Sequence, residues 1–270
     1  MRFALPIALL AALILAQNPQ PSAPWVSSVV NPPPADANSK KARLLLDQMI
    51  DALGGQAYLS YQDMYQEGRR HNFYEGRPTG VGVPFFRYWR WPDQDRTEYF
   101  AQHDYVVLYV GDQGYDTTFR GTRLVDPEDL AQYLHRREHS LEVVLRRWLP
   151  DPGTALFYDG SALVEQKPAE SVTLVNSKND SVTIYIDTYA HLPIKKTYRV
   201  RDPVSRERDE EGEVFDHYKL MQGIQTPFSI VRYHNGQMTR QLFVKKVRYN
   251  LGVSDALFTP PPLHYDRTKK

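Results

Sequence analysis

The chain has 270 residues, enough for one large domain or two small ones. It carries 33 Lys and Arg against 32 Asp and Glu, a balance that argues against a nucleic-acid partner, which requires a net basic surface. Cysteine is absent, which excludes disulfides, a thiolate nucleophile, a Cys-ligated metal and acylation at an N-terminal cysteine.

The N-terminal segment, residues 1–16, reads as a secretory signal peptide. Arg2 precedes an apolar run, Phe3 to Ala16, that is shorter than the about 20 residues needed to span a bilayer. This pattern predicts export to the periplasm, with an uncleaved anchor as the alternative. Residues 17–40 include the run Pro32-Pro33-Pro34 and are predicted to form a Pro-rich linker.

The folded domain is predicted over residues 41–262, with a C-terminal tail over residues 263–270. Near its start, a helix is expected to begin at Ser39 and to end at Gly54-Gly55. Apolar residues at helical spacing give this helix one buried face, formed by Leu46, Met49, Ile50 and Leu53.

Most of the remaining chain is predicted to be β-structure. Runs rich in aromatic and β-branched residues are separated by turn residues, and Asn235-Gly236 is typical of a hairpin turn. About ten strands exceed a comfortable flat sheet, so the sheet must curl or close. The first strands are expected at Tyr58–Phe73, Val81–Trp91, Arg96–Phe100, Tyr105–Val110 and Gly114–Arg120, and strands resume from Gly153 to Tyr249.

One amphipathic helical segment, Asp126 to Leu149, interrupts the strands. Asp126 is a good N-cap, Pro127 fits the first helical position, and Ser140 can cap a second helix after a bend. The apolar stripe of this segment includes Leu130 and Leu134. A sheet whose face is covered by such a segment can enclose an apolar cavity beneath a helical lid.

A metal-binding motif occurs in this segment, at His135-Arg136-Arg137-Glu138-His139. Two His four residues apart on a helix can bind zinc, with Glu138 as the base. Two arginines inside the motif disfavour a dication, so catalytic zinc is only the alternative interpretation. The favoured interpretation involves no cofactor and no enzymatic activity.

Charged clusters elsewhere are expected to be solvated. Lys195, Lys196, Arg199 and Arg201 form a basic strand predicted to face solvent, with contact to anionic headgroups as the alternative. The acidic residues Glu210 to Glu213 are predicted to belong to a solvated, charged hairpin.

Several short motifs, taken in order, resemble the LolA-like superfamily of periplasmic lipoprotein carriers. They are Ala52-Leu53-Gly54-Gly55, Gly111 to Tyr115, Ile186 to Lys196, Tyr218 to Phe228 and Ala256 to Pro261. The resemblance is greatest to exported members labelled outer-membrane lipoprotein-sorting proteins. It implies an incomplete, strongly curved β-barrel whose mouth is closed by helices and whose apolar interior holds acyl chains.

The sequence therefore predicts a mainly β fold with an N-terminal helix and a central helical lid, acting as a monomeric carrier of lipid or lipoprotein acyl chains. Inner- or outer-membrane proteins are its expected further partners. A zinc hydrolase using His135 and His139 is one alternative, and an envelope scaffold or sensor that binds another protein is the other. The expected cavity residues are Leu134, Leu141, Leu145 and Trp148 in the lid, and Phe85, Trp89, Leu108, Ile184, Ile186, Phe228 and Ile230 in the wall.

Overall fold

A computed structural model describes residues 35–201 and 208–267. The chain divides into a unit over residues 1–32 and a unit over residues 33–270, and the description concerns the second. The predicted signal peptide and residues 17–34 of the predicted linker lie outside the described residues, and residues 35–40 of that linker belong to a helix. Within the described ranges, no helix combines the length and apolarity required to cross a bilayer.

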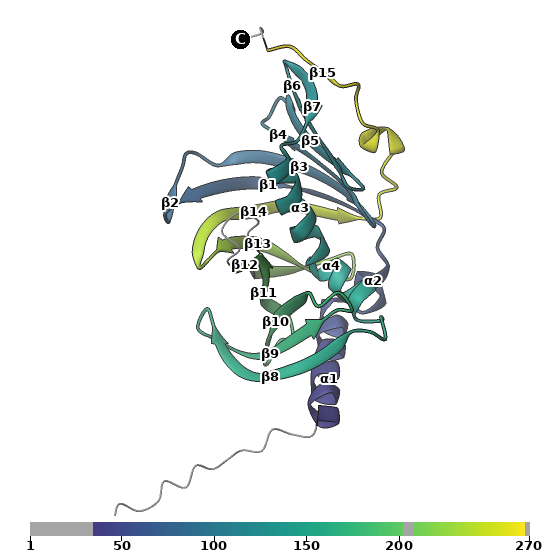
Figure 1. Cartoon of the computed structure of the whole chain (residues 1–270), viewed down its shortest axis with the longest axis vertical. Coiled ribbons are helices and arrows are strands. Elements are labelled where there is room, and N and C mark those ends of the chain that lie inside the picture. The colour runs from purple at the N-terminus through teal and green to yellow at the C-terminus, as the bar shows by residue number, and fades with distance from the viewer. Residues whose placement is uncertain (1–34, 202–207, 268–270) are drawn as a thin grey trace, which may run out of the picture. The chain divides into compact units, whose positions relative to one another are not determined.

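The second unit is built on one 15-stranded sheet in which neighbouring strands run antiparallel (Figure 1). Its strand order is β15-β7-β6-β5-β4-β3-β1-β14-β13-β12-β11-β10-β9-β8, with β2 paired to β1. The sheet curves without closing, which confirms the predicted incomplete barrel. The strands are β1 (Asp63–Tyr74), β2 (Arg77–Pro78), β3 (Val83–Arg90), β4 (Gln94–Tyr99), β5 (Tyr105–Val110), β6 (Gln113–Thr118), β7 (Gly121–Leu124), β8 (Ala155–Val164), β9 (Lys167–Val175), β10 (Ser181–Asp187), β11 (Pro193–Arg201), β12 (Arg208–Met221), β13 (Ile224–His234), β14 (Gln237–Tyr249) and β15 (His264–Tyr265).

Helices occur at the start of the unit and in the middle of the chain. The first group is α1 (Ala35–Leu53) and α2 (Gln56–Ser60), and a 3-10 turn, η2 (Asp255–Phe258), follows the last long strand. The central segment is α3 (Pro127–Glu138), α4 (Leu141–Val143) and the π-helical turn η1 (Val144–Trp148).

The main apolar core lies between α1, the α4–η1 segment and strands β9 to β14. Its fully buried members include Leu46 and Met49 of α1, Val144 of η1 and Ile184 of β10. The apolar face predicted for the first helix is therefore confirmed. Burial of this kind contributes about 25 cal/mol per Å² of apolar surface, so the core fixes one half of the sheet against the helices.

Some predicted boundaries differ from the observed ones. The first helix already includes residues 35–38, before the expected start at Ser39, and Asp36 and Lys40 form an exposed ion pair of 2.6 Å within it. Residues 58–60, expected to start a strand, belong to α2 instead, and the Tyr58 side chain of this helix is buried. Within the predicted C-terminal tail, His264–Tyr265 pair with β7 as β15.

Helix caps in the central segment follow the sequence signals. The Asp126 carboxylate accepts a hydrogen bond from the Glu128 amide, and the Ser140 hydroxyl accepts one from the Val143 amide. The second cap starts a new helix after Ser140, so α3 and the α4–η1 pair are separate helical elements. The division lets α4–η1 pack into the core while α3 crosses the sheet face.

Candidate functional site

A cavity of about 450 Å³ lies between α3 and the concave face of the sheet. This volume is within the range of about 300 to 1,000 Å³ that is usual for small-molecule sites. Alternate residues of β3, β4 and β5 line it, as expected when successive side chains point to opposite faces, and β1 and β12 to β14 contribute further residues. The lining is mixed in character, with aromatic, aliphatic and charged side chains together.

Helix α3 turns its polar face toward this cavity. The lining residues Asp129, Tyr133, Arg136 and Ser140 recur at helical spacing. Leu130 and Leu134, the part of the predicted apolar stripe that lies on α3, are only half-buried. Helix α3 therefore presents tyrosine and arginine to the cavity, whereas Leu141 of α4 lines it with a leucine.

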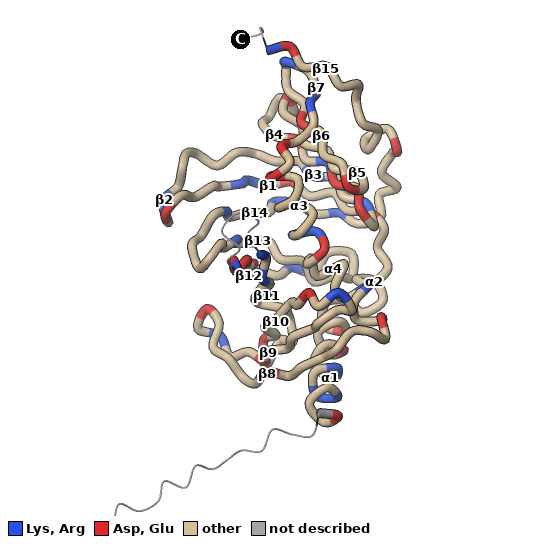
Figure 2. The backbone as a smooth tube through the Cα atoms, in the orientation of Figure 1, with Lys and Arg blue, Asp and Glu red and all other residues tan. Residues whose placement is uncertain are grey.

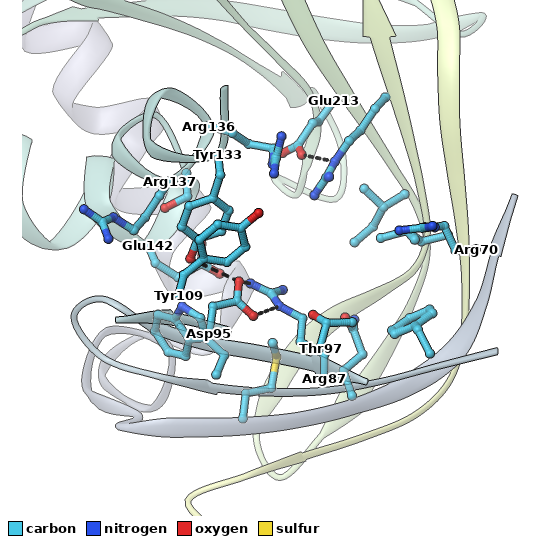
Figure 3. A pocket seen from close by; sticks show the side chains of 18 of the residues that line it. Arg70, Arg87, Asp95, Thr97, Tyr109, Tyr133, Arg136, Arg137, Glu142 and Glu213 are labelled. Atoms are coloured by element: carbon cyan, nitrogen blue, oxygen red, sulfur yellow. Dashed lines mark hydrogen bonds and ion pairs between the residues drawn. The ribbon is translucent and has the colours of Figure 1, made fainter. Parts of the chain in front are cut away.

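One side of α3 is attached to strands β4 and β5. The Tyr133 ring stacks on Tyr109 with centroids 3.5 Å apart, and its hydroxyl donates to Asp95 at 3.3 Å (Figure 3). Burial, followed by the Asp95 charge, raises the pKa of Tyr133 well above its usual range. Asp95 also accepts a two-pronged ion pair from Arg87, at 2.9 and 2.8 Å. Arg137 adds a hydrogen bond to the Gly111 carbonyl at the β5–β6 turn.

The other end of α3 is attached to β11 through a buried lysine. Lys196 is 1% exposed, and its Nζ donates to the His139 carbonyl at 2.6 Å and pairs with Glu213 at 3.1 Å. A cation at this position also complements the negative end of the helix. The prediction that Lys196 faces solvent is wrong, because its ammonium sits between the helix end and the sheet.

A row of charged residues runs across four adjacent strands on the cavity side. Lys196 of β11 lies opposite Glu213 of β12, Glu213 opposite Arg232 of β13, and Arg232 opposite Arg240 of β14. Arg232 donates to Glu213 at 2.8 Å. Burial alone would raise the pKa of Glu213, but Lys196, Arg232 and Arg136 outweigh it and lower the pKa to about 2. The prediction that Glu213 belongs to a solvated hairpin is therefore wrong.

Cations outnumber carboxylates around this row. Arg70, Arg136 and Arg240 line the cavity, and none of their side chains makes a hydrogen bond or an ion pair with any described residue. The Nε atom of Arg70 is buried without a partner, although its guanidinium lies 4.3 Å from the Tyr99 ring centroid. Burial and then the charges of Arg232, Arg136 and Arg70 lower the pKa of Arg240 below its ordinary value. Charged residues of both signs are spread over the sheet, so this excess of arginine is local (Figure 2).

An apolar row lies beside the charged row. Two residues further along the same strands, Phe215 lies opposite Ile230, Ile230 opposite Leu242, and Leu242 opposite Arg70. These apolar side chains also line the cavity, and Phe215 belongs to the main core. The charged row is closer to the Asn235–Gly236 turn, so polarity decreases along β13 and β14 from the turn toward the core.

The predicted site residues are divided by the structure between cavity and core. Phe85, Trp89, Leu141 and Ile230 line the cavity. Their role in ligand binding remains a prediction. The others do not line it: Leu134 is half-buried on α3, Leu108 packs in a separate cluster with Tyr115 and Phe258, and Leu145, Trp148, Ile184, Ile186 and Phe228 lie in the main core.

The two histidines of the zinc motif lie in different environments. His135 is exposed, whereas His139 is 3% exposed and stacks on Tyr198 with centroids 4.4 Å apart. Burial lowers the pKa of His139, and Glu138 accepts from the Trp148 indole at 3.1 Å. Across residues 35–201 and 208–267, no group of three His, Asp or Glu side chains could hold a metal ion.

The arginines of this cavity were not predicted from the sequence. For Arg232 and Arg240 the informative feature is the Asn235-Gly236 turn, because a tight hairpin places the residues that flank it opposite one another. Counting outward from the turn brings Arg232 and Arg240 together, allowing for one irregularity after Arg232. Arg70 and Arg136 have no such local signal, since their convergence depends on the long-range order of the strands.

Comparison with solved structures shows a shared fold. A DUF1329 family protein from Desulfovibrio piger aligns with a TM-score of 0.56 at 14% identity, over 81% of this chain and 97% of that one. A putative outer membrane lipoprotein-sorting protein domain from Vibrio parahaemolyticus aligns with a TM-score of 0.52 at 9% identity, over 83% and 97%. No protein-family model matches the chain, and no curated protein matches its sequence. The incomplete-barrel fold expected from the sequence is therefore shared with these two solved structures.

Proposed function

We propose that this protein is a periplasmic, non-enzymatic binding protein that carries lipid or lipoprotein acyl chains in the cavity beneath α3. The observation that carries the proposal is the 450 Å³ cavity between a separately attached helix and an open, curved sheet. The shared fold with a lipoprotein-sorting protein domain supports the proposal.

The cavity walls suit an acyl chain. Phe85 and Trp89 of β3 and Ile230 of β13 present apolar surface, and Leu141 adds to it from α4. Each methylene removed from water contributes about 0.8 kcal/mol, so even part of an acyl chain supplies useful affinity. The scaffold alternative predicts a filled interior, and a cavity of this size favours the carrier.

The attachments of α3 allow ligand entry. They consist of the Tyr133–Tyr109 stack, a few hydrogen bonds and the Arg137–Asp112 ion pair at 2.9 Å, without the continuous apolar packing that fixes α1. Elements held by few buried apolar contacts open at lower free energy than the core does. We expect α3 to move away from β4 and β5 when a ligand enters.

Binding of a fluorescent fatty-acyl probe tests the proposal. Leu242→Gln and Ile230→Gln, which make the apolar row polar, should each weaken probe binding by about tenfold or more, in line with about 1.5 to 3 kcal/mol for burial of such a side chain. Leu220→Gln, at a position on β12 that is 66% exposed, is the matched control and should bind like the parent. Failure of the parent to bind the probe, or equal weakening by all three variants, would contradict the proposal.

A further inference from the structure

We infer that the cavity selects an anionic amphiphile, whose negatively charged head is bound by Arg70, Arg136, Arg232 and Arg240 and whose apolar chain lies along Phe215, Ile230 and Leu242. The inference rests on the proposed function and adds to it the chemical class of the ligand. The head would be a phosphate or a carboxylate, which the planar guanidinium group matches with paired hydrogen bonds.

Positive charge exceeds negative charge in the charged row. Arg232 and Arg240 lie directly opposite on β13 and β14, an arrangement that is unfavourable for like charges. Glu213 is the carboxylate of this row, and its side chain is already paired with both Lys196 and Arg232. An anion placed between the arginines would supply the missing negative charge.

Several of the guanidinium groups that line the cavity have unused hydrogen-bond donors. Each guanidinium group has five N–H donors and no acceptor. Arg70, Arg136 and Arg240 donate to no described residue, and the buried Nε of Arg70 lacks a partner altogether. Leaving buried donors without partners is costly, whereas the oxygens of a phosphate or carboxylate would satisfy several of them together. By contrast, Arg87 is already satisfied by Asp95 and belongs to the lid attachment.

Arg136 faces the sheet arginines from the other side of the cavity. This residue comes from α3, whereas Arg70, Arg232 and Arg240 come from the sheet, and all of them line the same cavity. In Figure 3 the Arg136 side chain points toward Glu213, into the space that Arg70 borders from the other side. A bound head would therefore contact the lid and the sheet together and would favour the closed position of α3.

The order of polarity along the strands defines the orientation of the ligand. The charged row lies toward the Asn235–Gly236 turn, and the apolar row lies two residues closer to the core. A molecule with its charge at one end and an apolar chain at the other matches this order. A free inorganic anion would leave the apolar row unused, and a neutral lipid would leave the arginines unpaired.

Calorimetric titration with dodecyl phosphate, dodecylphosphocholine and inorganic phosphate tests the inference on the full mature chain. We expect dodecyl phosphate to bind at least tenfold more tightly than zwitterionic dodecylphosphocholine, and inorganic phosphate to bind at least a hundredfold more weakly than dodecyl phosphate. Arg136→Gln and Arg240→Gln should each reduce the preference for dodecyl phosphate over dodecylphosphocholine by at least threefold. Arg248→Gln, at an exposed residue of β14 that does not line the cavity, is the matched control and should retain the preference.

The outcomes separate the inference from the proposed function. Equal binding of the two dodecyl ligands would overturn the charge preference while leaving the acyl carrier intact. Inorganic phosphate binding as tightly as dodecyl phosphate would identify a free-anion site and overturn the amphiphile. If neither dodecyl ligand bound the parent, the inference and the carrier would both fail. Arg240→Gln removes a like-charge contact, so its unfolding midpoint without ligand should equal or exceed that of the parent, which keeps the binding result interpretable.

Discussion

Replacing Lys196 with methionine is expected to destabilise the protein and to free one end of α3. The side chain is 1% exposed, and its ammonium holds both Glu213, at 3.1 Å, and the His139 carbonyl, at 2.6 Å. Methionine keeps the chain length but leaves a buried carboxylate short of one partner and a helix carbonyl without its donor. Removing one partner from a buried ion pair costs about 3 to 5 kcal/mol, and a value near the middle of that range is expected because Arg232 still pairs with Glu213.

Denaturant unfolding with hydrogen exchange measures both effects. Lys196→Met should lower the free energy of unfolding by about 4 kcal/mol and should speed exchange at the C-terminal amides of α3 more than in α1. Combining it with Glu213→Gln should recover part of the loss, because the uncompensated charge is then removed. Lys195→Met is the matched control, because among the described residues that ammonium makes only a cation–π contact, with Tyr185 at 5.7 Å, and less than about 1 kcal/mol is expected. A loss below about 1 kcal/mol for Lys196→Met would refute the reasoning.

Further predictions concern pH, ligand, core and lid. Because the pKa of Glu213 is about 2 when folded against an ordinary value of 4.5, its contribution to stability is complete above about pH 4.5 and is lost as the pH falls toward 2; Glu213→Gln should remove about 3 kcal/mol of this acid dependence in unfolding titrations. Shortening the acyl chain of a bound probe by two methylenes should weaken binding about 15-fold by calorimetry. Leu145→Ala should lower the free energy of unfolding by about 2 to 5 kcal/mol while leaving the probe affinity of the folded protein unchanged, because Leu145 lies in the core. Tyr133→Leu should speed hydrogen exchange in α3 by about fivefold, since it removes a stack worth about 1 kcal/mol, and exchange in α1 should not change.

The fold was largely predictable because its signals are local. The helix caps at Asp126 and Ser140, the apolar face of α1 and the Asn235–Gly236 turn each depend on residues close in sequence. The boundaries at Ser39 and Tyr58 were less predictable, since the exact ends of helices are poorly specified by sequence patterns.

The site was only partly predictable, because burial does not distinguish a cavity wall from a filled core. Leu145 and Ile184 have the same apolar pattern as Leu141 and Ile230, and only the positions of α1 and α4–η1 decide which of them face empty space. The burial of the charged residues was not predicted for a related reason. Lys196 and Glu213 look solvated in sequence, yet strand order places them opposite one another beneath the end of α3.

The most direct test of the proposed carrier function is to identify what the protein holds when it is isolated from the cells that produce it. Native mass spectrometry gives the mass of the intact complex, and lipid extraction with mass spectrometry identifies its contents. An acyl lipid or lipopeptide at about one per chain is the predicted result, and an anionic head on that molecule would further support the arginine site. A lipid-free protein that also fails to take up a fluorescent fatty-acyl probe would contradict the carrier and would favour a protein-binding scaffold.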